Sequence, residues 1–159
     1  MDLSTIGIKF GWAVETVAGK KPTAFTWIPR CSKIGGITVT REKIDVTCFE
    51  DTIKKYIAGV GDTGGDWPIN FNGSKKFVDR WNSFLAAYEE AAENELATWA
   101  NVFIPGFGSY FVKMEPCEIP MSDLEVNNKL DMQMGCVINE YVGLDEGIEP
   151  ELAAGDTED

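Results

Sequence analysis

Residues 130–138 read LDMQMGCVI, the longest strictly alternating segment of the chain. Its even-numbered positions are all apolar, whereas its odd-numbered positions are mostly polar or small. A period of two is typical of a β-strand that packs one face on a core. The opposite face of such a strand meets water or a channel. The stretch therefore predicts a long strand in a mainly β protein, with Asp131 on the wet face.

Strand patterns continue on the N-terminal side of this stretch. Residues 99–104 and 110–114 are strand-like and flank the Pro-Gly-Phe-Gly segment 105–108, which predicts a hairpin. Residues 67–71 form a shorter strand-like piece, and residues 6–49 indicate strands separated by turns. Within that last region, a half-buried strand is predicted by the alternating apolar residues Ile44, Val46 and Cys48.

One α-helix is predicted over about residues 75–95, with Ser74 as its N-cap. Apolar side chains recur three or four positions apart along one face, namely Phe77, Trp81, Phe84, Leu85, Tyr88 and Ala92. We expect this aromatic stripe to pack on a sheet and not to line a ligand site. The predicted architecture is a β-sandwich or partial barrel of two packed sheets with one flanking α-helix.

The charge balance of the chain is strongly acidic. Its 159 residues, about one domain, carry 26 Asp and Glu against 14 Lys and Arg, a net charge of −12. Such a surface repels phosphate backbones and anionic lipids, so we expect no nonspecific binding of nucleic acid or membrane. Residues 145–159 hold seven acids and no base. They predict an acidic C-terminal tail, mobile and solvated unless it docks, after a folded domain of residues 1–144.

The residues that most often bind metals or catalyse reactions are scarce. The chain has no His, which removes the commonest general base and metal ligand. Its cysteines lie far apart, so we expect no metal or cofactor, and small buried hydrophobes at Cys31, Cys48, Cys117 and Cys136. No signal-peptide pattern and no membrane-length apolar run is present. We therefore expect a protein kept in a reducing cytosol with free thiols.

Two motif-like segments lack the context that their chemistry requires. Residues 59–64, GVGDTG, match the dinucleotide fingerprint, but no apolar strand precedes them and Pro68 blocks a following helix. Residues 62–64, DTG, also match an aspartic protease motif, but glycines replace the apolar flanks. We therefore expect a flexible loop here and no enzymatic activity.

Five segments, kept in order from about residue 5 to 145, carry a resemblance to a known family. They are residues 6–16 (IGIKFGWAVET), 33–37 (KIGGI), 51–59 (DTIKKYIAG), 62–65 (DTGG) and 139–145 (NEYVGLD). Together they are similar to the major tail tube proteins of long-tailed, siphovirus-like bacteriophages. No single segment is specific, and the resemblance rests on their order and spacing.

The resemblance implies a structural virion protein. In that family, two packed sheets and a helix form a subunit, six subunits form a ring with a β-barrel lining, and stacked rings form the tube for DNA ejection. The implied partners are copies of the chain, the tape measure, tail tip and terminator proteins, and double-stranded DNA that passes without specific binding. No membrane is implied. The implied location is the virion tail, after assembly in the host bacterial cytoplasm.

The resemblance also implies two groups of site residues. The Gly-rich segment lies where the family carries a loop or hairpin that reaches a neighbouring subunit or ring. We expect a mobile inter-subunit loop comprising Tyr56, Gly59, Gly61, Asp62, Gly64, Gly65 and Trp67. We also expect a net negative lumen, lined by Glu125 and Asp131, because an acidic channel does not retain DNA phosphates. Glu125 shares the side of Asp131 only if the strand register is unbroken between them.

Two other functions stay open at this point. A related virion or tube component, such as a tail terminator or a secretion-tube protein, would use a similar fold. A small β-sandwich module that binds a glycan or peptide is the second alternative, with the isolated tryptophans Trp12, Trp27, Trp67 and Trp99 as a stacking platform. Tubes, rings and glycan-binding monomers would distinguish the three.

Overall fold

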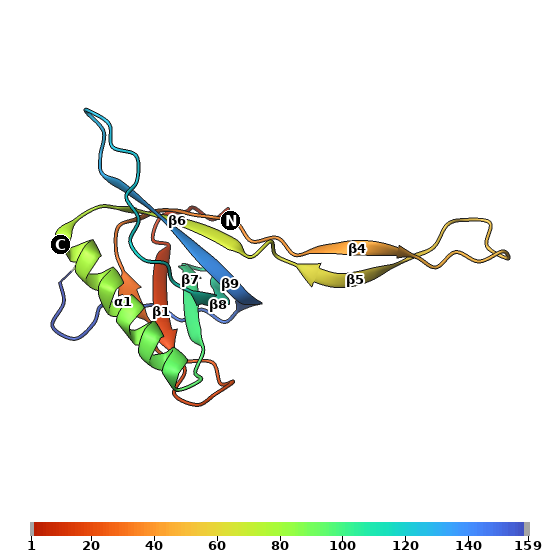
Figure 1. Ribbon diagram of the computed structural model, residues 1–159, viewed down its shortest axis with the longest axis horizontal. Coiled ribbons are helices and arrows are strands. Elements are labelled where there is room, and N and C mark those ends of the chain that lie inside the picture. The colour runs from red at the N-terminus through yellow and green to blue at the C-terminus, as the bar shows by residue number, and fades with distance from the viewer. Residues whose placement is uncertain (1, 158–159) are drawn as a thin grey trace.

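The computed structural model describes residues 2–157 and confirms a mainly β fold with two sheets and one helix (Figure 1). Seven strands form the larger sheet and two form the smaller one. The strands of the larger sheet are β1 (Lys9–Val14), β2 (Thr26–Ile28), β3 (Cys31–Ile34), β6 (Asp66–Asn72), β7 (Thr98–Ile104), β8 (Gly108–Glu115) and β9 (Asp131–Asp145). The smaller sheet pairs β4 (Thr40–Asp45) with β5 (Tyr56–Asp62), and the helix is α1 (Lys75–Glu93).

The larger sheet is antiparallel and curls into a partial barrel. Its order is β2-β1-β7-β8-β9-β6-β3. Strands β1 and β6 stand four positions apart, which in a flat sheet would separate them by roughly 19 Å. Yet the ring of Phe10 on β1 lies 6.0 Å from that of Trp67 and 5.8 Å from that of Phe71, both on β6. The sheet therefore closes over its own core.

Helix α1 covers one side of this core. The Ser74 hydroxyl accepts a hydrogen bond from Phe77 N (3.1 Å), so the predicted N-cap is confirmed. The apolar face buries Phe77, Trp81, Phe84 and Ala91, whereas Ala92 is exposed. Phe84 stacks on Trp12 of β1 at 5.0 Å, and Trp81 Nε1 donates to the Cys117 carbonyl at 2.8 Å. The aromatic stripe is core, as its spacing predicts.

Strand β9 confirms the alternation of its sequence. Met134, Cys136 and Ile138 are buried, while Gly135 and Val137 between them and Gln133 before them are exposed. Leu130, which the alternation places on the packed face, lies before the strand and is exposed. The strand extends beyond the predicted segment to Asp145 and pairs with both β6 and β8. The predicted hairpin is also present: β7 and β8 pair from Trp99↔Lys113 to Ile104↔Gly108 around the turn. These strands form the central part of the sheet.

The acidic C-terminal segment docks on the body as far as Thr157, so this part is not the mobile arm that its composition predicts, and residues 158–159 of the predicted tail lie outside the described residues. The Pro150 ring lies over Gly11 of β1, where an added Cβ would be 2.6 Å from Pro150 Cβ. Backbone atoms of Glu151 bond to Trp27 N (2.7 Å) and Phe25 O (3.0 Å), covering the outer edge of β2. Further along, Arg80 of α1 pairs with Asp156 at 2.8 Å. These contacts join residues that are far apart in the sequence, so amino-acid composition alone could not predict them.

Candidate assembly surface

A two-stranded arm projects from the body (Figure 1). It is an antiparallel hairpin paired from Thr40↔Asp62 to Asp45↔Tyr56, with a bulge between Arg41 and Lys43. Glycines keep its strands close, since an added Cβ on Gly61 would lie 2.7 Å from Val39 Cγ1. Because the arm has only two strands and little cover, its own sheet supplies little stability.

The tip of the arm, residues 46–55, is a hydrogen-bonded turn. Val46 N donates to the Lys55 carbonyl (3.0 Å), and Cys48 N donates to the Asp51 carboxylate (3.0 Å). Lys55 Nζ also pairs with Asp51 at 2.9 Å. The Cys48 amide and then Lys55 therefore hold the pKa of Asp51 below its usual range. Phe49 lies within this turn with its side chain fully exposed (107%). The turn thus fixes an aromatic ring in solvent at the far end of the molecule.

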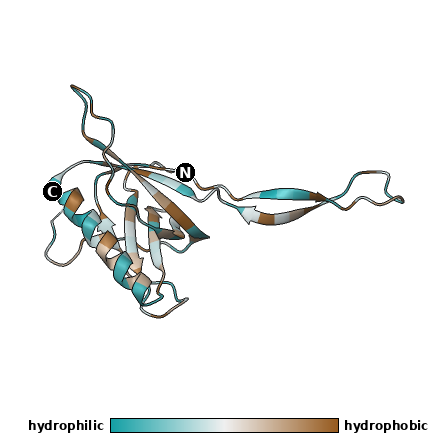
Figure 2. Cartoon of the chain, in the orientation of Figure 1, coloured by the Kyte–Doolittle hydropathy of each residue, from teal (hydrophilic) through white to brown (hydrophobic). Residues whose placement is uncertain are grey.

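Apolar side chains are exposed all along the arm, and apolar segments on it are visible in Figure 2. The large exposed ones are Val39, Ile44, Val46, Phe49, Ile53, Tyr56, Ile57 and Val60. Ile44 and Val46, predicted to be half-buried, are 47% and 44% exposed, and Cys48 is exposed instead of buried. Strand β4 ends at Asp45, before Val46 and Cys48, and within residues 2–157 no other segment covers either of its faces. A contiguous exposed apolar segment of this kind marks an interaction surface.

The structure divides the predicted mobile loop into three parts. Four of its residues lie on strand β5, namely Tyr56, Gly59, Gly61 and Asp62. Gly64 and Gly65 make the turn into β6 with φ of +85° and +80°, which suits glycine alone. Trp67 is a core residue, 1% exposed, whose Nε1 donates to the Gly35 carbonyl at 2.7 Å. The prediction of one loop over these residues is therefore wrong, because its glycines serve a strand and a turn, and the exposed tip is at residues 46–55. That the exposed residues of this group contact another subunit stays a prediction.

Asp131 and Glu125, the residues expected to line a lumen, lie on different elements. Asp131 opens β9 opposite Asn72, and its Oδ2 accepts from Asn70 Nδ2 at 2.9 Å. Glu125 is exposed in the loop that precedes β9, where its carboxylate accepts from Asn128 Nδ2 at 2.7 Å. Asn127 has φ +66°, so no continuous strand register joins the two acids. Both are accessible from a cavity of about 510 Å³ that includes Lys33 and Lys129.

A second projecting segment also exposes apolar side chains. The loop between β8 and β9 stands out from the body beside the start of β9 (Figure 1). It exposes Met121, Leu124, Val126 and Leu130, with fractions from 47% to 89%. Sequence periodicity did not find this loop as a site. The sequence feature that could have pointed to this loop is its set of isolated apolar residues in a segment with no regular pattern.

The cysteine thiols differ in their environments. Cys136 is buried on β9 and Cys117 is partly buried near it. A hydrogen bond from Cys136 outweighs burial and lowers the pKa of the Cys117 thiol to about 7. Burial raises the pKa of Cys31 to about 12. Within residues 2–157, no three His, Cys, Asp or Glu side chains gather in a way that could hold a metal ion.

The described helix does not combine the length and the apolar character that are needed to cross a membrane. The features that remain exposed and unexplained by the fold are apolar: the arm and the loop before β9. Also, in the part of the chain that the structure describes, no strand pairs with the outer edge of β3. A free edge and exposed apolar projections are what a self-assembling subunit presents.

Chains in three solved structures of assembled particles have a fold similar to this one. A chain from the virion of a native gene transfer agent particle is 15% identical, with a TM-score of 0.51, covering 76% of this chain and 88% of that chain. A chain from the six-fold symmetrised baseplate of the anti-feeding prophage is 13% identical, with a TM-score of 0.51 over 94% and 99% of the two chains. A third, from the tail of an empty gene transfer agent particle refined with C6 symmetry, is 14% identical, with a TM-score of 0.52 over 87% and 93%. No family model and no curated protein matches the sequence. These likenesses establish a shared fold.

Proposed function

We propose that the chain is a structural subunit of a phage-like tail, and that it forms hexameric rings which stack into the tube for DNA ejection. The observation that carries the proposal is the solvent-exposed apolar arm on a fold shared with tail components. An arm with this composition is costly for a monomer to expose but useful for a subunit that buries it on assembly. The six-fold symmetry of two of the similar particles supports a hexamer.

The geometry of the subunit favours a closed or stacked assembly. The arm and the body surface are different, so a contact between them on two copies is heterologous. Such contacts make rings when the rotation closes and stacks or filaments when it does not. The outer edge of β2 is covered by Glu151, whereas β3 presents an open edge that a ring would cover.

The proposed subunit works without chemistry of its own. We propose that it is not an enzyme, that it resides in the virion tail after assembly in the host cytoplasm, and that it contacts the tape measure, tail tip and terminator proteins. DNA would pass an acidic wall without binding, which the net charge of −12 supports.

Electron microscopy of the purified protein tests the proposal. We expect rings or hollow tubes, with tubes promoted by a tail-tip initiator complex. A protein that stays monomeric by light scattering at high concentration, and yields no tubes with the initiator, would refute it.

A second candidate is a baseplate tube component of a contractile injection device. It is favoured by the anti-feeding prophage baseplate chain, which is covered over 99% of its length. Such a component would form a single ring that nucleates a different tube protein. Rings that never stack with their own kind, but cap tubes of another subunit, would favour this candidate.

A further inference from the structure

An open groove of about 640 Å³ lies on the body at the base of the arm. Its floor and walls come from the curled sheet and the segment before β1, and they are mainly apolar. The principal lining residues are Ile8, Ile34, Gly36, Ile104 and Tyr110. Lys33 on the open edge strand β3 also lines it. The groove is therefore an apolar concavity with a positive charge at its border.

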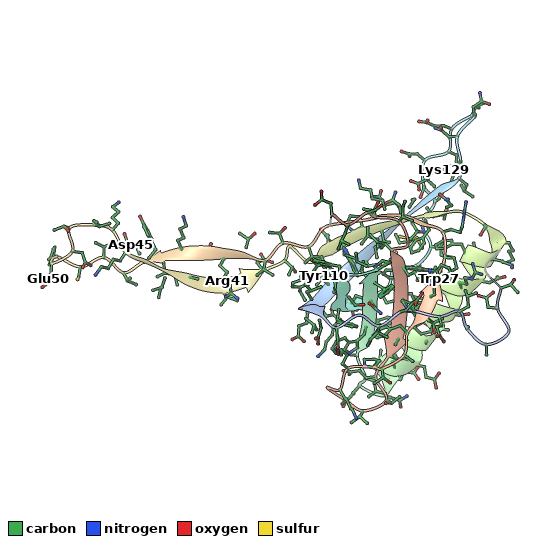
Figure 3. All side chains as sticks on the ribbon, turned by 180° about the vertical axis from the view of Figure 1, so that it is seen from behind. Trp27, Arg41, Asp45, Glu50, Tyr110 and Lys129 are labelled. Atoms are coloured by element: carbon green, nitrogen blue, oxygen red, sulfur yellow. The ribbon has the colours of Figure 1, made fainter. Side chains whose placement is uncertain are left out.

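The arm of the same chain cannot fill this groove. Gly35, Gly36 and Ile37 line it and lead directly into the arm, so the groove and the arm tip lie at opposite ends of the hairpin. About twelve residues of extended chain separate base from tip, or roughly 35–40 Å. Figure 3 shows this separation, with Glu50 at the far end of the arm and Tyr110 on the body near its base. Any arm tip in the groove belongs to another copy.

The arm tip carries an apolar group and a charge that suit the apolar lining and the lysine of the groove. The tip presents one fully exposed aromatic ring, Phe49, next to the acid Glu50. The neighbouring acid Asp51 is already paired with Lys55, so Glu50 is the free acid of the turn. Among residues 2–157, Lys33 forms no ion pair. A buried aromatic anchor with a charged pair at its rim is the usual anatomy of a protein interface.

We propose that the arm tip of one subunit docks in this groove on a second copy, with Phe49 in the apolar groove and Glu50 paired with Lys33. The contact is heterologous, so each copy both donates an arm and receives one. The inference rests on the proposed self-assembly and adds to it the receiving surface. It also explains why the turn at residues 46–55 is held rigid by Asp51, since a preorganised tip loses less entropy on docking.

A charge-reversal experiment with tubes as the readout tests this pairing. We expect Glu50→Lys and Lys33→Glu each to lower the assembled fraction about tenfold or more, because each places like charges together at the contact. The double variant, which restores opposite charges, should recover most of the assembly. Lys43→Glu, an equal charge change on the shaft of the arm, serves as the matched control and should assemble like the wild type.

Filling the groove gives an independent measurement. A Cβ added at Gly36 would meet no atom within 4 Å, and Gly36 does not have positive φ, so Gly36→Trp should fold while its ring occupies the groove. We expect Gly36→Trp and Phe49→Asp to keep the wild-type melting temperature and lose tubes. Val17→Asp, at an exposed apolar position in the loop after β1, should keep both.

The outcomes separate this inference from the proposed function. Wild-type tubes together with full assembly of Gly36→Trp, or single charge reversals that the double variant does not rescue, would overturn the docking contact and leave the tube assignment standing. A wild-type protein that forms neither rings nor tubes would overturn both.

Discussion

Replacement of Glu15 by Gln tests how the end of β1 is held. Glu15 is 4% exposed, and its carboxylate accepts hydrogen bonds from Ala97 N at 2.9 Å and from Trp99 Nε1 at 3.0 Å. Burial raises the pKa of this carboxyl, but the hydrogen bonds from Ala97 and Trp99 outweigh it, so the pKa lies below its ordinary value. The carboxylate thus joins β1 to the segment that leads from α1 into β7.

The structure sets the expected magnitude. A Gln side chain keeps one acceptor oxygen but turns an NH₂ group toward the second donor. One charge-assisted hydrogen bond is lost and one buried donor is left unsatisfied, which together cost about 2–3 kcal/mol of unfolding free energy at pH 7. Because the folded pKa is depressed, the contribution of Glu15 is fully present above its unfolded pKa of about 4.3. It is lost as the pH falls through the folded value.

Urea unfolding followed by tryptophan fluorescence, from pH 7 down to pH 3, measures this prediction. The difference between wild type and E15Q should be largest at pH 7 and should shrink below about pH 4.3, because the carboxyl of the unfolded wild type takes up a proton there before that of the folded protein does. Glu149→Gln, which alters an exposed ion pair to Lys9, is the control and should stay within about 0.5 kcal/mol. A difference for E15Q below 0.5 kcal/mol, or one that does not change with pH, would refute the reasoning.

Three further predictions address the arm, the C-terminal segment and the channel. Replacing residues 40–62 with a short turn should leave the melting temperature of the body unchanged or slightly raised, because the shorter connection favours folding by ~1.5 kcal/mol. The same variant should form no tubes. Unfolding of the body would show instead that the arm is structural. Gly11→Ala should destabilise the protein by about 1–3 kcal/mol, because its Cβ would overlap Pro150. It should also expose the C-terminal segment to proteolysis. Unchanged stability and an unchanged rate of proteolysis would contradict the docking of this segment on β1. The Asp131→Lys variant should still assemble, but its reconstituted particles should release DNA more slowly, most strongly at low salt. Equal release rates at low and high salt would argue against a lumen position for residue 131.

The elements with a local signal could be predicted from the order of the amino acids alone. The helix follows from a Ser cap and an apolar repeat of three to four residues, and its face buries Phe77, Trp81 and Phe84 as predicted. Strand β9 follows from strict alternation, and the β7–β8 hairpin follows from its Pro-Gly turn. These patterns work because backbone geometry fixes which neighbouring side chains share a face.

Which of the apolar faces are covered within the chain could not be predicted from local patterns and is seen in the folded structure. The alternation around Ile44 predicts a buried face, yet that face is exposed on an arm, because no other segment among the described residues covers it. Trp67 follows a run of glycines that suggests a loop, yet the closure of the sheet over Phe10 places it in the core. The acidic segment docks because Pro150 fits over Gly11, a contact between residues at opposite ends of the chain. Periodicity predicts that a surface is apolar, but the identity of the surface that covers it depends on packing between distant segments and, in the assembly that we propose, on packing between copies.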